Sequence, residues 1–143
     1  MTSWALAGGP IKPSWGVLAA QLTAARRKCD LCFSMKVVRI QDFERPEAQG
    51  IFATPIVDGD QSNVRIIRLA PGQALPPHRH GVSDLMLYSA AGEGELDVPE
   101  GAVTFNVGSL AFYRGDEELR VRNTGSIDLT LLAFLVPKFA ASS

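Results

Sequence analysis

Residues 72–92 read GQALPPHRHGVSDLMLYSAAG and contain the only two histidines of the chain, His78 and His80. The two prolines before them keep this segment from being a fully paired central strand. Side chains two residues apart in an extended segment project to the same side, so both imidazoles can reach one ion or one ligand. Asp84 follows and offers a carboxylate. The stretch predicts either a metal site that does chemistry or the remains of one.

Short β-rich runs, separated by turn residues, lie on both sides of this stretch. Strands are expected at 36–40, 51–57, 63–70, 75–80, 84–90, 94–98, 102–106, 109–113, 119–123 and 128–136. In LRVRN, the apolar Leu119 and Val121 share one face and are expected inside, which turns Arg120 and Arg122 outward. Many short strands at this spacing predict an all-β sandwich or barrel. Its buried residues should include Leu119, Val121, Leu129 and Leu131.

Residues 1–34 differ in character from the rest of the chain. Residues 13–28, PSWGVLAAQLTAARRK, carry apolar side chains near helical spacing and end in a basic run that suits the negative end of a helix dipole. We expect an N-terminal extension over 1–34, either a short helix or a loose segment, followed by a barrel domain over 35–143. Cys29 and Cys32 form a C-x-x-C pair without further cysteine ligands or a following βαβ unit, so they are interpreted as ordinary reduced thiols.

Composition narrows the class of protein. The chain has 143 residues, with 14 basic against 15 acidic side chains and a net charge of −1. This balance does not favour nucleic acid or an anionic membrane as a partner. No apolar run approaches the roughly 20 residues of a membrane span, and the first residues lack the basic start and apolar stretch of a signal peptide. We expect a cytoplasmic protein with one main domain.

The motifs of residues 72–92 and 108–123 resemble those of the cupin superfamily. The first family motif is a glycine, five residues, H-x-H, three or four residues, a glutamate, six residues and a glycine, and it fits from Gly72. The second resembles GSLAFYRGDEELRVRN, in which Gly108 and Asn123 keep the family spacing. The resemblance implies a cupin-type double-stranded β-helix, a jelly-roll-like barrel of two facing sheets, and commonly a homodimer.

The chain departs from the family pattern at its metal ligands. Where the second motif has its histidine, this chain has Leu119. The acid of the first motif falls on Asp84 with a three-residue gap, which puts Ala91 at the closing glycine, and on Leu85 with a four-residue gap, which puts Gly92 there. Of the four ligands that the resemblance implies, two histidines remain, and Asp84 is the candidate for a third.

Two interpretations of the site therefore stay open. His78, His80 and Asp84 would form the two-histidine, one-carboxylate set that suits Fe(II), Mn(II), Ni(II) or Zn(II), with Glu117 or Glu118 as a further ligand. The metal would be weak or absent because Leu119 replaces a ligand. Alternatively, the site is vestigial, and the histidines are polar groups of a ligand pocket.

The barrel interior is the expected place for a small-molecule ligand. Its lining is expected to come from large apolar and aromatic strand residues, although such residues can equally be ordinary core residues. These are Met86, Tyr88, Phe105, Phe112, Tyr113 and Leu119. One of Arg65 and Arg68 could face inward and pair an anion, although a solvated face is commoner. The candidate functions are a metal-dependent dioxygenase, isomerase or cyclase of a small organic molecule, and a non-catalytic ligand-binding or structural cupin.

Overall fold

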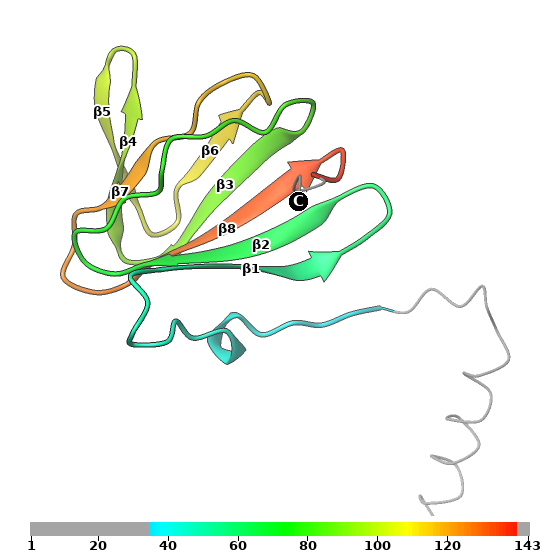
Figure 1. The fold of residues 1–143 in the computed structure, drawn as a ribbon, viewed down its shortest axis with the longest axis horizontal. Helices are drawn as coiled ribbons and strands as arrows, with labels where there is room; N and C mark the ends of the chain where they lie inside the picture. Colours follow the sequence, from blue (N-terminus) through cyan, green and yellow to red (C-terminus); the bar gives the residue numbers. More distant parts are fainter. Residues whose placement is uncertain (1–34, 140–143) are drawn as a thin grey trace, which may run out of the picture. The chain divides into compact units, whose positions relative to one another are not determined.

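The computed structural model describes residues 35–139, which form an almost entirely β structure of two antiparallel sheets (Figure 1). The larger sheet has the order β1-β2-β8-β3-β6 and the smaller one β5-β4-β7. The strands are β1 (Ile51–Asp58), β2 (Asn63–Leu69), β3 (Asp84–Ala91), β4 (Glu93–Val98), β5 (Gly101–Asn106), β6 (Leu110–Tyr113), β7 (Val121–Asn123) and β8 (Leu129–Val136). Within this part of the chain, no helix has the length and hydropathy to cross a membrane. The predicted N-terminal helix and both cysteines lie outside the described residues.

Most predicted strands agree with the observed ones, but two segments differ. The prolines of the 75–80 segment lack N–H donors, and the segment makes one isolated bridge, His78 with Leu119, while Ala74 just before it bridges Arg122. The predicted strand at 36–40 is wrong, and the region holds a single 3₁₀ turn, η1 (Ile40–Asp42). Its backbone carbonyls are satisfied by the guanidinium of Arg68, which donates to the oxygens of Ile40 and Phe43 at 3.1 and 2.7 Å.

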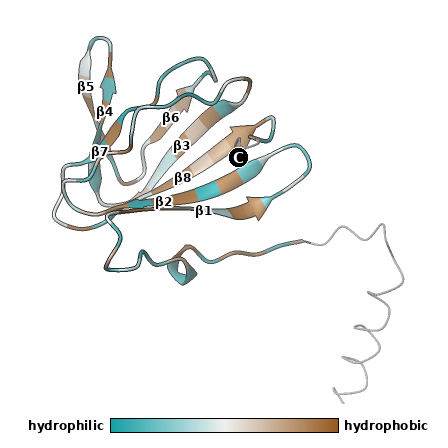
Figure 2. Ribbon diagram, viewed as in Figure 1, coloured by the Kyte–Doolittle hydropathy of each residue, from teal (hydrophilic) through white to brown (hydrophobic). Residues whose placement is uncertain are grey.

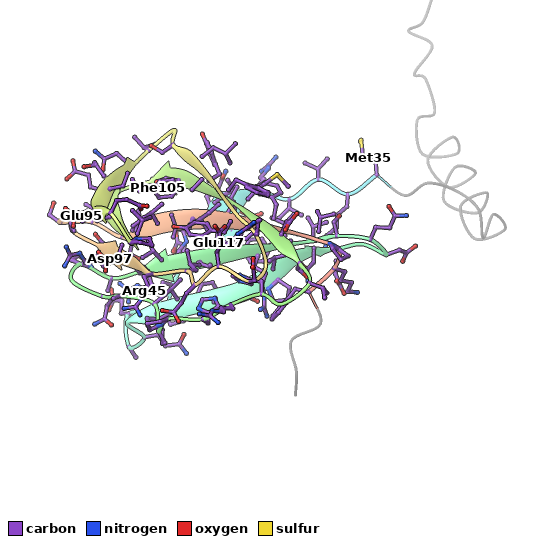
Figure 3. The ribbon with its side chains drawn as sticks, turned by 90° about the horizontal axis from the view of Figure 1, so that it is seen from above. Met35, Arg45, Glu95, Asp97, Phe105 and Glu117 are labelled. Carbon is purple, nitrogen blue, oxygen red and sulfur yellow. The ribbon has the colours of Figure 1, made fainter. Side chains whose placement is uncertain are left out.

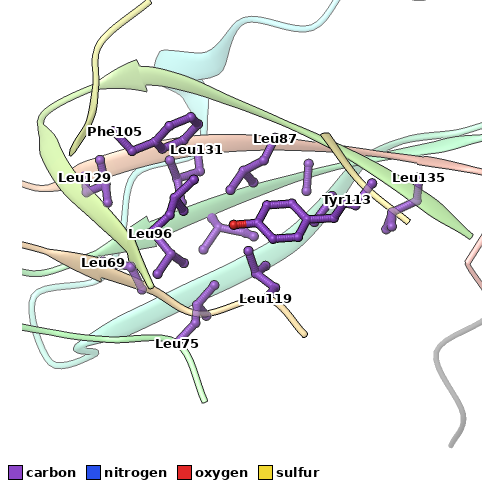
Figure 4. Packing of buried hydrophobic residues seen from close by; sticks show 14 residues of the cluster. Leu69, Leu75, Leu87, Leu96, Phe105, Tyr113, Leu119, Leu129, Leu131 and Leu135 are labelled. Atoms are coloured by element: carbon purple, nitrogen blue, oxygen red, sulfur yellow. The ribbon is translucent and has the colours of Figure 1, made fainter. Parts of the chain in front are cut away.

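Leucines from both sheets meet in one core (Figure 4). The larger sheet contributes Leu69, Leu85, Leu87, Leu129, Leu131 and Leu135, and the smaller sheet and its loops contribute Leu75, Leu96, Phe105, Leu119 and Val121. The predicted burial of Leu119, Val121, Leu129 and Leu131 is confirmed. The period-2 pattern of these strands therefore does identify the face that is removed from water.

The outer face of the larger sheet is covered only in part. Arg68 crosses it to Thr130 of β8 and holds the chain around η1 against it. Farther along the sheet, Met86 lies opposite both Phe134 and Phe112, and Tyr88 lies opposite Leu132. Met86, Tyr88 and Phe112 are exposed, so this end of the outer face is apolar and open in the described chain.

Candidate functional site

Backbone contacts fix the segment that carries the two histidines. His78 and Leu119 exchange backbone hydrogen bonds, with the Leu119 amide donating to the His78 carbonyl at 2.8 Å. The His80 amide donates to the Gly115 carbonyl at 3.0 Å. A Cβ at Gly115 would lie 2.1 Å from the carbonyl oxygen of Gly81, so only glycine permits this close approach. The second motif thus holds the first in place at the end of the barrel.

The two imidazoles lie together but in different environments. Their ring centroids are 4.9 Å apart in an edge-on arrangement. His78 is exposed, and its Nδ1 lies 2.8 Å from the Pro76 carbonyl oxygen. His80 is only 6% exposed and packs edge-on against Phe139, and its Nδ1 has no hydrogen-bond partner. Burial lowers the pKa of His80 from 6.5 to about 4, and the positive charges of His78 and Arg65 add to this effect.

Asp84 does not join the histidines, which corrects the predicted three-ligand set. Side chains of β3 alternate between faces, and those of Asp84, Met86 and Tyr88 are exposed while Leu85 and Leu87 are fully buried. Gly92 has φ +85° and no room for a Cβ beside the Asp128 carbonyl, as the closing glycine of the first motif requires. The four-residue gap is therefore the correct one, and Leu85 stands where the family has its acid.

The residues present do not fit a tightly held metal ion. Leu85 and Leu119, both 0% exposed, stand at two of the four ligand positions of the motifs. Among residues 35–139, no group of three histidine, cysteine or acidic side chains could hold a metal. The proposed extra ligands are engaged elsewhere, since Glu117 accepts a bond from the Arg114 amide and Glu118 one from Arg120. What remains is a pair of imidazoles, one of them oriented by a backbone carbonyl.

The predicted pocket residues separate into three groups. Phe105 and Leu119 are core residues, as burial alone would explain. Met86 and Tyr88 are each 36% exposed on the outer face, so their placement in the barrel interior was wrong. The sequence DLMLYSA has apolar side chains on both faces of the strand, and the covering sheet decides which face is inside. Phe112 also lies on the outer face, 61% exposed, but its strand is at the sheet edge, where it borders a pocket.

That pocket, of about 820 Å³, lies between β6 of the larger sheet and the β4–β5 hairpin. Leu96, Val103, Ala111 and Tyr113 supply inward-facing side chains. Its charged lining residues are Arg79, Asp97, Glu100, Asp116, Glu117, Glu118 and Arg120, two basic against five acidic side chains. Along β4, Glu95 and Asp97 alternate with the inward-facing Leu96, and Figure 3 shows these two acidic residues near each other at one end of the molecule.

Tyr113 brings a hydroxyl into this apolar surrounding. Its ring lies among the core leucines, with the oxygen directed toward the side of Leu96 (Figure 4). The hydroxyl is buried and has no hydrogen-bond partner. Burial raises the pKa of Tyr113, and the negative charge of Glu117 contributes further. A buried hydroxyl normally finds a partner, so this unpartnered group is an unusual feature beside the pocket.

The structure also identifies polar interior residues that the sequence analysis did not single out. Asn63, Ser83 and Ser89 are buried, and each has a side-chain oxygen without a partner. Asn63 and Ser89 lie on inward positions of β2 and β3, where a strand pattern predicts apolar residues. A polar residue at an inward position was the signal available in the sequence, but it is visible only when the inward face is known.

Comparisons with known proteins agree with this geometry. A family model described as "Cupin domain" matches residues 65–135. TT1209 from Thermus thermophilus is similar, with 25% identity over 73% of this chain and 99% of that one and a TM-score of 0.66. An RmlC-like cupin protein from Desulfovibrio desulfuricans has 20% identity over the same shares and a TM-score of 0.65. A predicted oxalate decarboxylase from Thermotoga maritima has 22% identity over 61% and 80% and a TM-score of 0.56. The search of curated proteins gives no match.

The two sheets, their strand order and the solved structures define a double-stranded β-helix. The family model over residues 65–135 and the two motifs place this chain in the cupin superfamily. The predicted fold class is confirmed.

Proposed function

We propose that this chain is a cupin that binds a small organic molecule in the pocket between its two sheets and does so without a tightly bound metal. The observation that carries the proposal is the pocket itself, whose floor combines apolar side chains with the buried, unpartnered hydroxyl of Tyr113. Small-molecule sites are concave and combine apolar side chains with polar groups that fix the orientation of the ligand, and this pocket has apolar side chains beside seven charged residues. The leucines at positions 85 and 119 support metal-independent binding, because they remove two ligands.

A metal-dependent enzyme of oxidoreductase or isomerase type is the second candidate. It is favoured by the contact between the rings of His78 and His80, which two adjacent ligands of one ion would show. Likeness to a predicted oxalate decarboxylase at 22% identity supports the shared fold and does not transfer that activity. Under this alternative the two histidines would hold Fe, Mn, Ni or Zn with non-protein ligands completing the set.

The test uses two matched variants in which an alanine is replaced by phenylalanine. Ala111 lines the pocket, whereas Ala102 lies exposed on β5. A library of small organic molecules is screened by thermal shift against chelator-treated wild type, Ala111→Phe and Ala102→Phe. We expect compounds that stabilise wild type and Ala102→Phe and lose their effect in Ala111→Phe, whose ring fills the pocket.

Stabilisation only after addition of Fe(II), Mn(II), Ni(II) or Zn(II), lost in His78→Ala and kept in Ala111→Phe, would favour the metal-dependent alternative. Compounds that stabilise Ala111→Phe and Ala102→Phe equally would argue against the pocket as the binding site.

A further inference from the structure

Arg65 is a cation on the inner face of the larger sheet. It pairs with Ala133 in β8, and Ala133 pairs with Leu87 in β3, so the three side chains share one face. Ala133 and Leu87 belong to the buried core, which makes this the inner face. Arg68 lies three residues on and has the opposite orientation, bonded to Thr130 and to the chain around η1. Hydrophilic segments interrupt the otherwise hydrophobic β2 in Figure 2.

Arg65 has no counter-charge within residues 35–139. Its Nε is buried without a hydrogen-bond partner, and no carboxylate of the described chain forms an ion pair with it. Arg45 and Arg122, by contrast, pair with Asp128 and Glu95. A guanidinium stays charged at any pH that a protein tolerates, and a partly buried charge without a partner costs stability. This arrangement is expected where an anion from outside the chain binds.

Two nine-tenths-buried polar side chains lie at the same end of the barrel. Asn63, on the same face of β2 as Arg65, donates from Nδ2 to the Phe139 carbonyl at 3.0 Å, which leaves its Oδ1 without a partner. His80 packs on the Phe139 ring and has an unpartnered Nδ1. The charge of Arg65 contributes to the lowered pKa of His80, which is consistent with their proximity. Phe139 therefore joins Asn63 and His80 around the inner end of β2.

We propose that Arg65, His80 and Asn63 form an anion site that binds the carboxylate of a small hydroxy acid. The planar guanidinium matches the two oxygens of a carboxylate. The Nδ1 of a neutral imidazole can donate to the anion in one tautomer. The unpartnered Oδ1 of Asn63 needs a donor, which a hydroxyl next to the carboxylate supplies. None of these three residues lines the pocket between the sheets, so this site is additional to the one under Proposed function.

The test compares carboxylates with neutral analogues of the same size. The melting temperature of the full chain is measured with sodium glycolate, sodium acetate, glycolamide, acetamide and sodium chloride at constant ionic strength. We expect glycolate to raise the wild-type melting temperature by at least about 4 °C near saturation, acetate by less, and the amides and chloride not at all.

Two arginine variants separate the site from general salt effects. Arg65→Met should lose the glycolate response and melt at or above the wild-type temperature without ligand, because it removes an uncompensated charge. Arg122→Met, on the outer side of β7, should keep the full response. If Arg65→Met does not fold, Arg65→Lys replaces it and should bind glycolate at least tenfold more weakly.

Equal shifts with glycolate and glycolamide, no shift of wild type with either carboxylate, or a full response in the Arg65 variants would each overturn the proposal. The Ala111→Phe variant distinguishes the two sites, since it should block pocket ligands and keep the glycolate response.

Discussion

Leu119 is the backbone partner of His78, and its side chain is completely buried in the core. The position that the second cupin motif gives to a histidine is therefore next to the remaining histidines and filled by an apolar side chain. Leu85, which is also fully buried, fills the position that the first motif gives to an acid. The cupin fold and the adjacent pair of histidines are retained here, whereas two of the four ligand positions of the motifs hold leucine.

Restoring the missing ligands should restore metal binding. Leu119→His adds a third imidazole, and the double variant Leu85→Glu, Leu119→His supplies the full set. We expect calorimetry with Fe(II), Mn(II), Ni(II) and Zn(II) to show weak or no binding by wild type, tighter binding by the single variant and the tightest by the double variant. His78→Ala is the control that should abolish uptake. If neither variant binds any of the four ions, the histidine pair has no metal-binding role.

Acid should destabilise the protein through His80. Because burial lowers the pKa of His80 to about 4, the unfolded chain binds a proton below its ordinary value of 6.5 while the folded chain does not. The free energy of unfolding should fall as pH drops from 6.5 to 4, by about 3 kcal/mol at most. Urea denaturation of wild type and His80→Phe over this range measures it, with His78→Phe as control. The same pH slope in wild type and His80→Phe would contradict this.

The inner face of β8 should dominate stability. Leu131 is fully buried, so Leu131→Ala should reduce the free energy of unfolding by about 2–5 kcal/mol. Thr104, on the outer face of β5 in the smaller sheet, is exposed, and Thr104→Ala should change it by less than about 0.5 kcal/mol. Denaturant titration compares the two, and similar losses would show that the strand faces are assigned incorrectly.

The exposed end of the outer face is the expected homodimer surface. It is formed by Met86, Tyr88, Phe112, Leu132 and Phe134, and contiguous apolar surface of this kind commonly binds another chain. Tyr88→Glu should convert a dimer to a monomer in sedimentation experiments. Ile127→Glu changes an exposed loop residue and should leave the dimer intact. A wild-type monomer at micromolar concentration would refute the expectation.

The sequence was informative wherever one face of a strand is polar. LRVRN showed which of its side chains are buried, and the structure agrees. It was ambiguous in DLMLYSA, where both faces of the strand are apolar and the motif admits two gap lengths. The acid position of the motif was therefore assigned to Asp84, whereas the structure places Leu85 there. The inward direction of Arg65 depends on pairing with β8 more than sixty residues away, which no local pattern contains. The pocket likewise joins β6 to the β4–β5 hairpin through tertiary packing.

The central claim is that two buried leucines leave this cupin without a tight metal site. It is tested most directly by elemental analysis of the full chain, purified without a polyhistidine tag and passed through a column in dilute chelator. The account predicts far less than one equivalent of Fe, Mn, Ni or Zn per chain, with the protein still folded. One equivalent of a single metal, retained through the chelator and lost in His78→Ala, would contradict it.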